Sequence, residues 1–300
     1  MTQTTLSALL RYPVKSMAGE ALVAGEVRGY GVVGDRAYAL VNTETGVVAS
    51  AKTVKRFGSL LGWQAHYVAE PAAAGATPAV QMTTPEGRTI RSDAPDAEAL
   101  LAAAFGPGVA LCASPPEGVL LEFPAGTVSG DLAALTQAPL GGAALGTFSD
   151  LAAIHLVTTS SLRAFEAASP ETAGMVARLR PNLILDTGAA EGFVENSWLG
   201  RTLHIGADLV LRLTMPTMRC VMTTLAHGPH AASPTFLRTV ARHNLVDFAA
   251  MAAAAPSPEA LGTAAGLLQA DIGKLPCAGL YADVLHPGHI TVGDTVRLGD

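Results

Sequence analysis

The sequence predicts a mainly β protein with a few helices, of the α+β class, on two observations. Short stretches of alternating or continuous apolar residues recur along the chain, and 31 Gly and 19 Pro are available for the turns between them. Apolar residues make up 49% and charged residues 15% of the 300 residues, which is enough to bury a sizeable core. We therefore expect one large domain or two of ordinary size.

The first third of the chain is typical of a small β unit. Strands are expected at residues 3–10, 20–28, 37–42, 63–69, 79–84 and 89–92, with a hairpin turn at 85–87. A helix is expected at 96–105, capped by Asp93 and ended by Gly106. Residues 115–147 are rich in Gly, Pro and Ala and weakly periodic, so we interpret them as a connecting region between domains at 1–125 and 126–300.

The second part returns to strands, with helices between them. Strands are expected at 154–158, 182–187, 202–205, 209–214, 279–285 and 295–298. A helical pattern at 162–168 follows three hydroxyl residues, and Ser-Pro at 233–234 and 257–258 predicts helices at 235–242 and 259–269.

Charge and cysteine content exclude several classes of function. A formal net charge of −6 without any Lys/Arg block argues against nucleic-acid binding. The N-terminus has no basic segment before an apolar core, and no apolar run is long enough to span a membrane, so we expect a soluble, cytoplasmic protein. Three scattered cysteines without a C-x-x-C pair indicate a reducing compartment and no iron–sulfur cluster.

Two familiar patterns have ordinary interpretations. Gly29-x-Gly31-x-x-Gly34 matches the dinucleotide fingerprint, but a strand follows it and Val54 stands where an acidic residue is needed, so we expect a tight turn between strands. The eight histidines lack zinc-site spacing, so we expect them to be surface or locally bonded residues. No serine-hydrolase or P-loop motif occurs.

The strongest chemical signal is Cys220, in the stretch M-P-T-M-R-C-V-M-T-T at 215–224. A free cysteine is usually a small buried apolar residue. On a strand, Cys220 would share a face with Met222 and Thr224 and have Arg219 beside it. A nearby cation can lower the pKa of a thiol and so favour the thiolate that soft metals bind.

Several other segments could form an anion site if the fold brings them together. Residues 158–161, T-T-S-S, lie between a strand and a helix, where they could cap the helix or direct backbone N–H groups at an anion. Lys15-Ser16, Arg36 and the run R-L-R-P-N at 178–182 are further candidates, each ordinary by itself. Lys52, Lys55 and Lys274 are interpreted as solvated charges.

Six ordered motifs give the chain a resemblance to a known family. They are Y-P-V-K-S at 12–16, G-D-R at 34–36, R-P-N-L at 180–183, E-N-S-W at 195–198, R-C-V-M-T-T at 219–224 and G-L-Y-A-D-V-L-H-P-G-H-I-T-V-G-D at 279–294. In order and spacing the chain resembles the MOSC family, named after the C-terminal domain of molybdenum cofactor sulfurase, with a MOSC N-terminal β-barrel. The resemblance implies a small N-terminal barrel-like domain packed on a C-terminal MOSC β-barrel with peripheral helices, and a helical insertion at 225–278.

The resemblance also implies a cofactor and the residues that bind it. Cys220 would be the catalytic thiolate ligand of the molybdenum in a molybdopterin-type cofactor. The pterin and its phosphate would be held by a set drawn from both halves of the chain: Lys15, Ser16, Arg36, Thr159, Ser160, Arg180, Asn182, Arg219 and Tyr281. Because Lys15 and Arg36 precede the predicted boundary and Cys220 follows it, we expect the site at the seam.

Relatives such as the amidoxime-reducing component and YcbX-type proteins reduce N-hydroxylated compounds, so the resemblance implies a small N-hydroxylated or N-oxide substrate. The chain has no iron–sulfur cysteine set or flavin motif, so electrons would come from separate donor proteins. The alternative is a cofactor carrier or sulfur-transfer protein with a persulfide on Cys220, while a pyridoxal-phosphate enzyme is disfavoured. Asn196 and Met218 depart from residues common in relatives, which bears on substrate preference.

Overall fold

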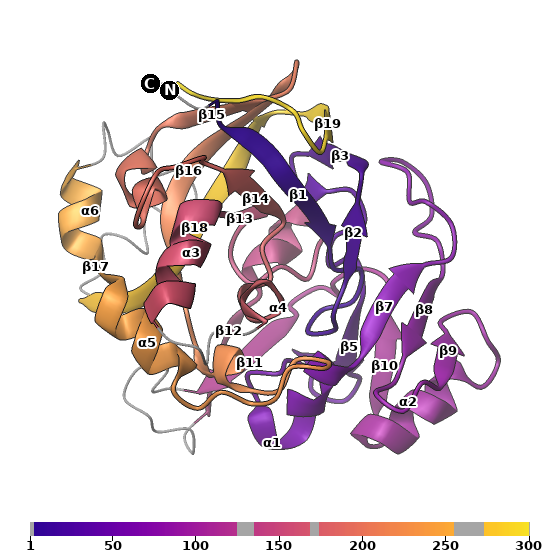
Figure 1. The fold of residues 1–300 in the computed structure, drawn as a ribbon. Coiled ribbons are helices and arrows are strands. Elements are labelled where there is room, and N and C mark those ends of the chain that lie inside the picture. The colour runs from indigo at the N-terminus through magenta and orange to yellow at the C-terminus, as the bar shows by residue number, and fades with distance from the viewer. Residues whose placement is uncertain (1–2, 125–134, 169–173, 255–272, 300) are drawn as a thin grey trace.

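A nine-stranded sheet forms the centre of the computed structural model, which describes residues 3–124, 135–168, 174–254 and 273–299 (Figure 1). Its strands run in the order β2 (Glu20–Leu22), β1 (Thr5–Arg11), β14 (Leu183–Asp186), β13 (Ile154–Thr158), β18 (Lys274–His286), β16 (Leu209–Met218), β15 (Thr202–Ile205) and β20 (Val296–Leu298), with β17 (Leu245–Asp247) paired to β18. The predicted mainly β class is confirmed.

Burial along these strands follows their position in the sheet. All five residues of β13 are buried, as expected for a strand covered on both faces, whereas β15 alternates between half-buried and buried residues. β13 and β14 are parallel, so the chain between them crosses over through α3 (Thr159–Ala168) and α4 (Met175–Leu179). Phe165 and Leu179 of these helices pack with Phe236 against the sheet.

Three smaller sheets complete the β structure. One has the order β10 (Val109–Cys112), β5 (Ala39–Asn42), β6 (Val47–Val48), β11 (Leu120–Pro124) and β12 (Leu135–Pro139). The others are β19 (Gly288–Thr291), β3 (Ala24–Arg28) and β4 (Gly31–Val32), and β7 (Gln64–Tyr67), β8 (Val80–Thr83) and β9 (Thr89–Arg91). Residues 115–147, which were interpreted as a connecting region, contain the paired strands β11 and β12.

The two ends of the sequence share sheets. β1 pairs with β14, placing Leu6 opposite Leu185, and β19 from the C-terminal end pairs with β3. Leu6 and Leu9 are fully buried in the same core cluster as Leu183 and Leu280. Hydrogen bonds and apolar burial therefore fix the early strands against the late ones.

The glycine-rich turn joins strands and opens no helix. Gly31 has a φ of 112°, and a Cβ placed there would lie 2.5 Å from the carbonyl oxygen of Ala153, so both the turn and its packing require glycine. The expected tight turn between β3 and β4 is confirmed.

The helices lie around the sheets, with α2 beside β7–β9 and α5 and α6 on the opposite side of the molecule (Figure 1). Their bounds are α1 (Val54–Phe57), α2 (Ala97–Phe105), α5 (Phe236–His243) and α6 (Phe248–Ala254), with 3₁₀ turns at η1 (Gly58–Gly62), η2 (Gly141–Leu145), η4 (Val194–Trp198) and η5 (Val221–Thr224). Gly106 ends α2 with a φ of 100°, as predicted.

Two helix predictions need comment. Asp93 does not cap α2, which begins at Ala97, because its carboxylate pairs with Arg91 instead. The helix predicted at 259–269 lies outside the described residues. Within the predicted insertion at 225–278, the described part contains α5, β17, α6 and the start of β18.

Candidate functional site

Cys220 lies in a tight turn at the end of β16. The strand ends at Met218, and Cys220 precedes the 3₁₀ turn η5, so the predicted alternation of strand faces at 220–224 was wrong. The hydroxyl of Thr223 donates to the carbonyl of Cys220 at 2.9 Å, and that of Thr224 donates to the carbonyl of Val221 at 2.7 Å. The paired threonines thus close the turn that carries the thiol.

Two buried side chains fix this turn from outside. Nη1 of Arg178 donates to the carbonyls of Thr223 (3.0 Å) and Leu225 (2.7 Å), and Nη2 donates to that of Ala231. Nε2 of His227 lies 2.9 Å from the carbonyl of Met222, and burial lowers the pKa of this imidazole to about 4. His227 is therefore neutral at pH 7 and donates through Nε2. These two side chains together therefore hold the carbonyls of Met222, Thr223 and Leu225.

Arg219 is held by protein acceptors. Its guanidinium donates to the carbonyl of Leu179 at 2.9 Å, and Nη2 lies 2.9 Å from Nε2 of His155. Burial, reinforced by the positive charge of Arg219, holds the pKa of His155 well below its usual value. A neutral His155 accepts from Arg219 at Nε2 and donates from Nδ1 to the carbonyl of Arg180 at 3.4 Å. Arg219 thus connects the Cys220 turn to β13.

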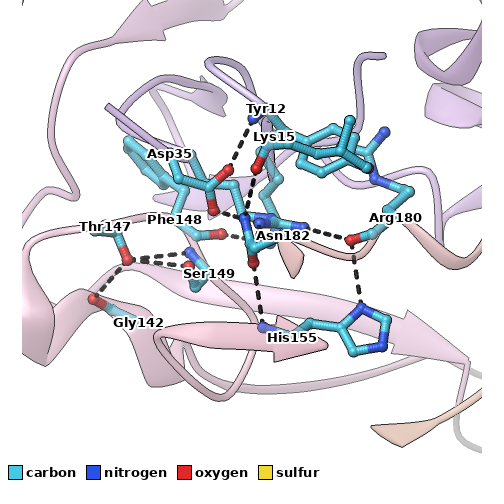
Figure 2. Close-up of polar contacts among 12 residues, drawn as sticks. Tyr12, Lys15, Asp35, Gly142, Thr147, Phe148, Ser149, His155, Arg180 and Asn182 are labelled. Carbon is cyan, nitrogen blue, oxygen red and sulfur yellow. Dashed lines mark hydrogen bonds and ion pairs between the residues drawn. The ribbon is translucent and has the colours of Figure 1, made fainter. Parts of the chain in front are cut away.

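A partly buried carboxylate joins two lysines. Asp150 pairs with Lys15 and, at 3.0 Å, with Lys52. Nζ of Lys15 also donates to the carbonyl of Phe148 at 2.7 Å (Figure 2). Burial lowers the pKa of Lys15 to about 8, although Asp150 acts in the other direction. Burial alone would raise the pKa of Asp150 and lower that of Lys52, but the charges of Lys15 and Lys52 lower the pKa of Asp150, and the charge of Asp150 raises that of Lys52. The interpretation of Lys52 as a solvated charge was wrong, because its side chain is 16% exposed.

Arg36 and Arg180 share one tyrosine ring. Their guanidinium groups lie 4.9 and 4.3 Å from the ring centroid of Tyr12. Arg36 pairs with Asp35, whose carboxylate also accepts from the backbone N–H of Tyr12 at 2.8 Å (Figure 2). Burial and the charge of Arg36 lower the pKa of Arg180 to about 10. Nη2 of Arg180 is buried and has no hydrogen-bond partner, which is the arrangement expected of a group that binds an anionic ligand.

Asn182 connects Arg36 to the backbone of His155. Its Oδ1 accepts from the backbone N–H of His155 at 3.2 Å, and Nη1 of Arg36 lies 3.5 Å from the same oxygen. In Figure 2, Asn182 and Arg180 both lie above His155 and bond to it. One amide thus links β13 and β14 to the segment that carries Arg36.

Three residues of this site have strained backbone conformations. Among the residues that the structure describes, three non-glycine residues have positive φ angles, namely Ser16 at 66°, Arg36 at 48° and Arg180 at 54°. Each such conformation costs about 1–3 kcal/mol and persists where the surroundings enforce it, frequently at ligand sites. All three residues line one cavity.

That cavity has a volume of about 410 Å³ and is lined from both halves of the chain. Eight of the ten predicted site residues line it: Lys15, Ser16, Arg36, Arg180, Asn182, Arg219, Cys220 and Tyr281. Six basic side chains line it, since Lys52 and Arg178 join Lys15, Arg36, Arg180 and Arg219, against the single carboxylate of Asp150. The described lining therefore favours an anionic ligand next to a thiol.

Family comparisons assign both halves of the chain. The model of the MOSC N-terminal beta barrel domain matches residues 3–100, and that of the MOSC domain matches residues 146–297. The chain belongs to the MOSC domain family. This confirms the family that the ordered motifs predicted, and MOSC domains are associated with molybdenum-cofactor-binding proteins.

Other comparisons with this MOSC protein are distant. No curated protein matches it. The YUAD protein from Bacillus subtilis is similar at 11% identity and a TM-score of 0.38, covering 99% of this chain and 96% of that one. YiiM from Geobacillus stearothermophilus is similar at 14% identity and a TM-score of 0.27, covering 50% of this chain and 55% of that one.

Thr159 and Ser160 are the two predicted site residues that do not line the cavity of the MOSC protein. Both lie in the first turn of α3, and their hydroxyls are used locally. Thr159 donates to Asp186 at 3.1 Å, and Ser160 lies 2.9 Å from the hydroxyl of Thr158, which in turn donates to Glu195. The structure therefore places both residues apart from the other eight predicted ligands. Thr158 caps α3, because its hydroxyl accepts from the N–H of Ser161 at 3.2 Å.

Sequence reasoning missed Asp150, His155 and Lys52 as members of this site. Asp150 follows a Gly/Ala-rich segment and His155 stands inside an apolar strand, so neither has a local pattern that marks it. For Lys52 the available signal was its position, because its neighbours Ser50 and Ala51 are buried and a charged residue is rarely buried without a partner.

Along the described chain, no helix has the length and apolar character to cross a membrane.

Proposed function

We propose that this MOSC protein binds a molybdenum cofactor in the cavity and uses it to reduce N-hydroxylated or N-oxide compounds, with electrons from a separate donor protein. The observation that carries the proposal is a cysteine in a fixed turn, Cys220, at a cavity whose described lining has six basic groups and one carboxylate. Soft thiolate suits molybdenum, and clustered cations suit the phosphate of a pterin cofactor.

The lining fits such a cofactor in its donor chemistry. Arg180 has a buried Nη2 without a partner, and Arg36 lies against the same tyrosine ring, so these two would hold the phosphate. Ser16 and Asn182 would contribute hydrogen bonds from the neighbouring wall. Cys220 would supply the protein's sulfur ligand.

The reaction requires two electrons and two protons, since breaking the N–O bond releases the reduced nitrogen compound and water. When bound, the cofactor would supply the two-electron redox change. The protein would hold the thiolate of Cys220 in place and keep protonated groups nearby. Lys15, with a pKa of about 8, and Lys52 both line the cavity in protonated form at pH 7.

The test is expression in a host that makes molybdenum cofactor, followed by metal and pterin analysis. Wild type should contain molybdenum and pterin together, Cys220→Ser should retain less molybdenum, and Cys112→Ser should match wild type because Cys112 lies on β10 outside the cavity. Absence of molybdenum from wild type would remove the basis of the proposal.

Turnover separates an enzyme from a carrier. The loaded protein, supplied with electrons by reduced methyl viologen, should convert benzamidoxime to benzamidine. A fully loaded protein without turnover, or a persulfide on Cys220 detected by mass spectrometry in place of molybdenum, would favour the carrier or sulfur-transfer function instead.

A further inference from the structure

One part of the cavity is apolar and continuous with the core. Four of its lining residues, Leu151, Met218, Leu275 and Tyr281, also pack against a single buried cluster. That cluster consists of Leu199, Met215, Val246, Phe248 and Cys277. We call the four cavity-lining side chains, Leu151, Met218, Leu275 and Tyr281, the apolar wall. Because the core supports it from behind, the wall is a fixed surface.

The apolar wall begins beside Cys220. In the antiparallel pair of β16 and β18, Met218 is opposite Cys277, and the N–H of Arg219 donates to the carbonyl of Pro276 at 2.8 Å. Leu275, next to Pro276 on β18, lines the same cavity as Cys220. Met218, two residues before Cys220, and Leu275 therefore line the cavity together with the residue that would ligate the metal.

The phosphate-binding groups come from other elements. Arg180 and Asn182 lie at the end of α4 and the start of β14, and Arg36 follows the β3–β4 turn. None of these three belongs to the cluster that supports the apolar wall. The cavity thus has basic groups suited to the cofactor's anion and a separate apolar surface next to Cys220.

We infer that the apolar wall binds the uncharged, apolar carbon skeleton of the substrate, and that Met218 is a specificity-determining residue. This inference rests on the proposed function and deepens it. A charged or strongly polar skeleton would lose hydration against the wall without gaining a hydrogen bond. Methionine is flexible and polarisable, so Met218 would accept apolar groups of differing shape, aromatic rings included.

The test compares two amidoximes that differ in their skeleton, benzamidoxime and acetamidoxime, by kcat/KM in the loaded protein. Wild type should prefer benzamidoxime by about tenfold or more, the discrimination that a few apolar atoms give in a fitted pocket. Met218→Ser should reduce that preference by about tenfold, chiefly through a higher KM for benzamidoxime.

The matched control is Met251→Ser. Met251 packs against the same core cluster but does not line the cavity, so its loss should perturb packing without changing the preference. Leu275→Thr is a second wall variant and should act like Met218→Ser. An unchanged preference in both wall variants, or the same loss in Met251→Ser, would overturn the inference.

Two further outcomes separate this inference from the proposed function. If loaded protein reduces neither amidoxime, the proposed reduction fails, and binding of non-reducible benzamide and acetamide by saturation-transfer NMR tests the wall alone. Benzamide should then bind more tightly than acetamide to wild type, and this difference should be absent in Met218→Ser. If Met218→Ser lowers cofactor content and leaves the preference intact, the wall holds the cofactor and the inference is wrong.

Discussion

Nη1 of Arg178 donates to the carbonyl of Thr223, 3.0 Å away and three residues beyond Cys220. The same guanidinium binds two further carbonyls of the following loop, so one side chain from α4 holds the end of the turn and the loop after it. A planar fork of donors can bind several carbonyls at once, which a lysine ammonium does less well. The position of the thiol therefore depends on a residue forty-two positions earlier in the sequence.

Arg178→Lys should loosen the Cys220 turn. Each lost hydrogen bond from a charged donor contributes about 1.5–3 kcal/mol, so local opening should become at least about tenfold more frequent. The measurement is the rate of Cys220 alkylation by iodoacetamide in cofactor-free protein, in a Cys112→Ser background. Arg163→Lys is the control, because Arg163 also binds two carbonyls, those of Gly188 and Ala190, but on the surface and away from the turn. Equal alkylation rates in wild type and Arg178→Lys would contradict the anchoring role.

Arg180→Met should weaken retention of an anionic cofactor more than it weakens the fold. The buried Nη2 of Arg180 has no protein partner, so its removal strands no acceptor at that nitrogen. We expect pterin content to fall by about tenfold or more after dialysis, as for loss of one charge-assisted hydrogen bond. A normal pterin content with a large drop in melting temperature would show that Arg180 acts structurally.

Asp150→Asn should destabilise the protein, because it leaves Lys15 and Lys52 buried without their carboxylate. Breaking a buried pair costs about 3–5 kcal/mol, and the 29% exposure of Asp150 places the expected loss nearer 2 kcal/mol. Denaturant unfolding at pH 7 measures it. Asp93→Asn, which removes the exposed partner of Arg91, should leave stability unchanged, and equal effects of the two substitutions would rule out the buried bridge.

His155 predicts a pH dependence of stability. Its pKa is well below the usual value in the folded protein because of burial and Arg219, so between that pKa and about 6.5 the unfolded chain binds the proton and the folded chain does not. The contribution of neutral His155 to the free energy of unfolding is therefore fully present above about pH 6.5. It is lost as the pH falls below that value, by about 1.4 kcal/mol per pH unit. The unfolding free energy of wild type minus that of His155→Gln should follow this slope between pH 6.5 and 5. A flat difference would mean that His155 titrates normally.

Much of the fold could be predicted from local patterns. β13 and the β8–β9 hairpin follow from apolar runs and turn residues, and Gly106 ends its helix because only glycine adopts that φ readily. The pairing of β1 with β14 could not be predicted, because it joins strands about 175 residues apart and no local signal encodes the partner. β11 and β12 were missed because their residues have little alternation.

The candidate site, like the fold, could be predicted only in part from the sequence. The ordered motifs identified Cys220, Arg180 and Asn182, which lie together in the cavity. Thr159 and Ser160 were chosen because hydroxyls at a strand-to-helix junction can bind an anion. In the structure Thr159 donates to Asp186, and Ser160 bonds to Thr158, which donates to the buried Glu195. Asp150 was missed because its role depends on two lysines about 100 and 135 residues away.

The central claim is that the thiolate of Cys220 ligates molybdenum. X-ray absorption at the molybdenum edge tests it most directly, on wild type and Cys220→Ser loaded in the same host. Cys220→Ser should have one sulfur ligand fewer at molybdenum, with the other sulfur distances retained, and Cys112→Ser should be identical to wild type. Identical sulfur coordination in wild type and Cys220→Ser would contradict it.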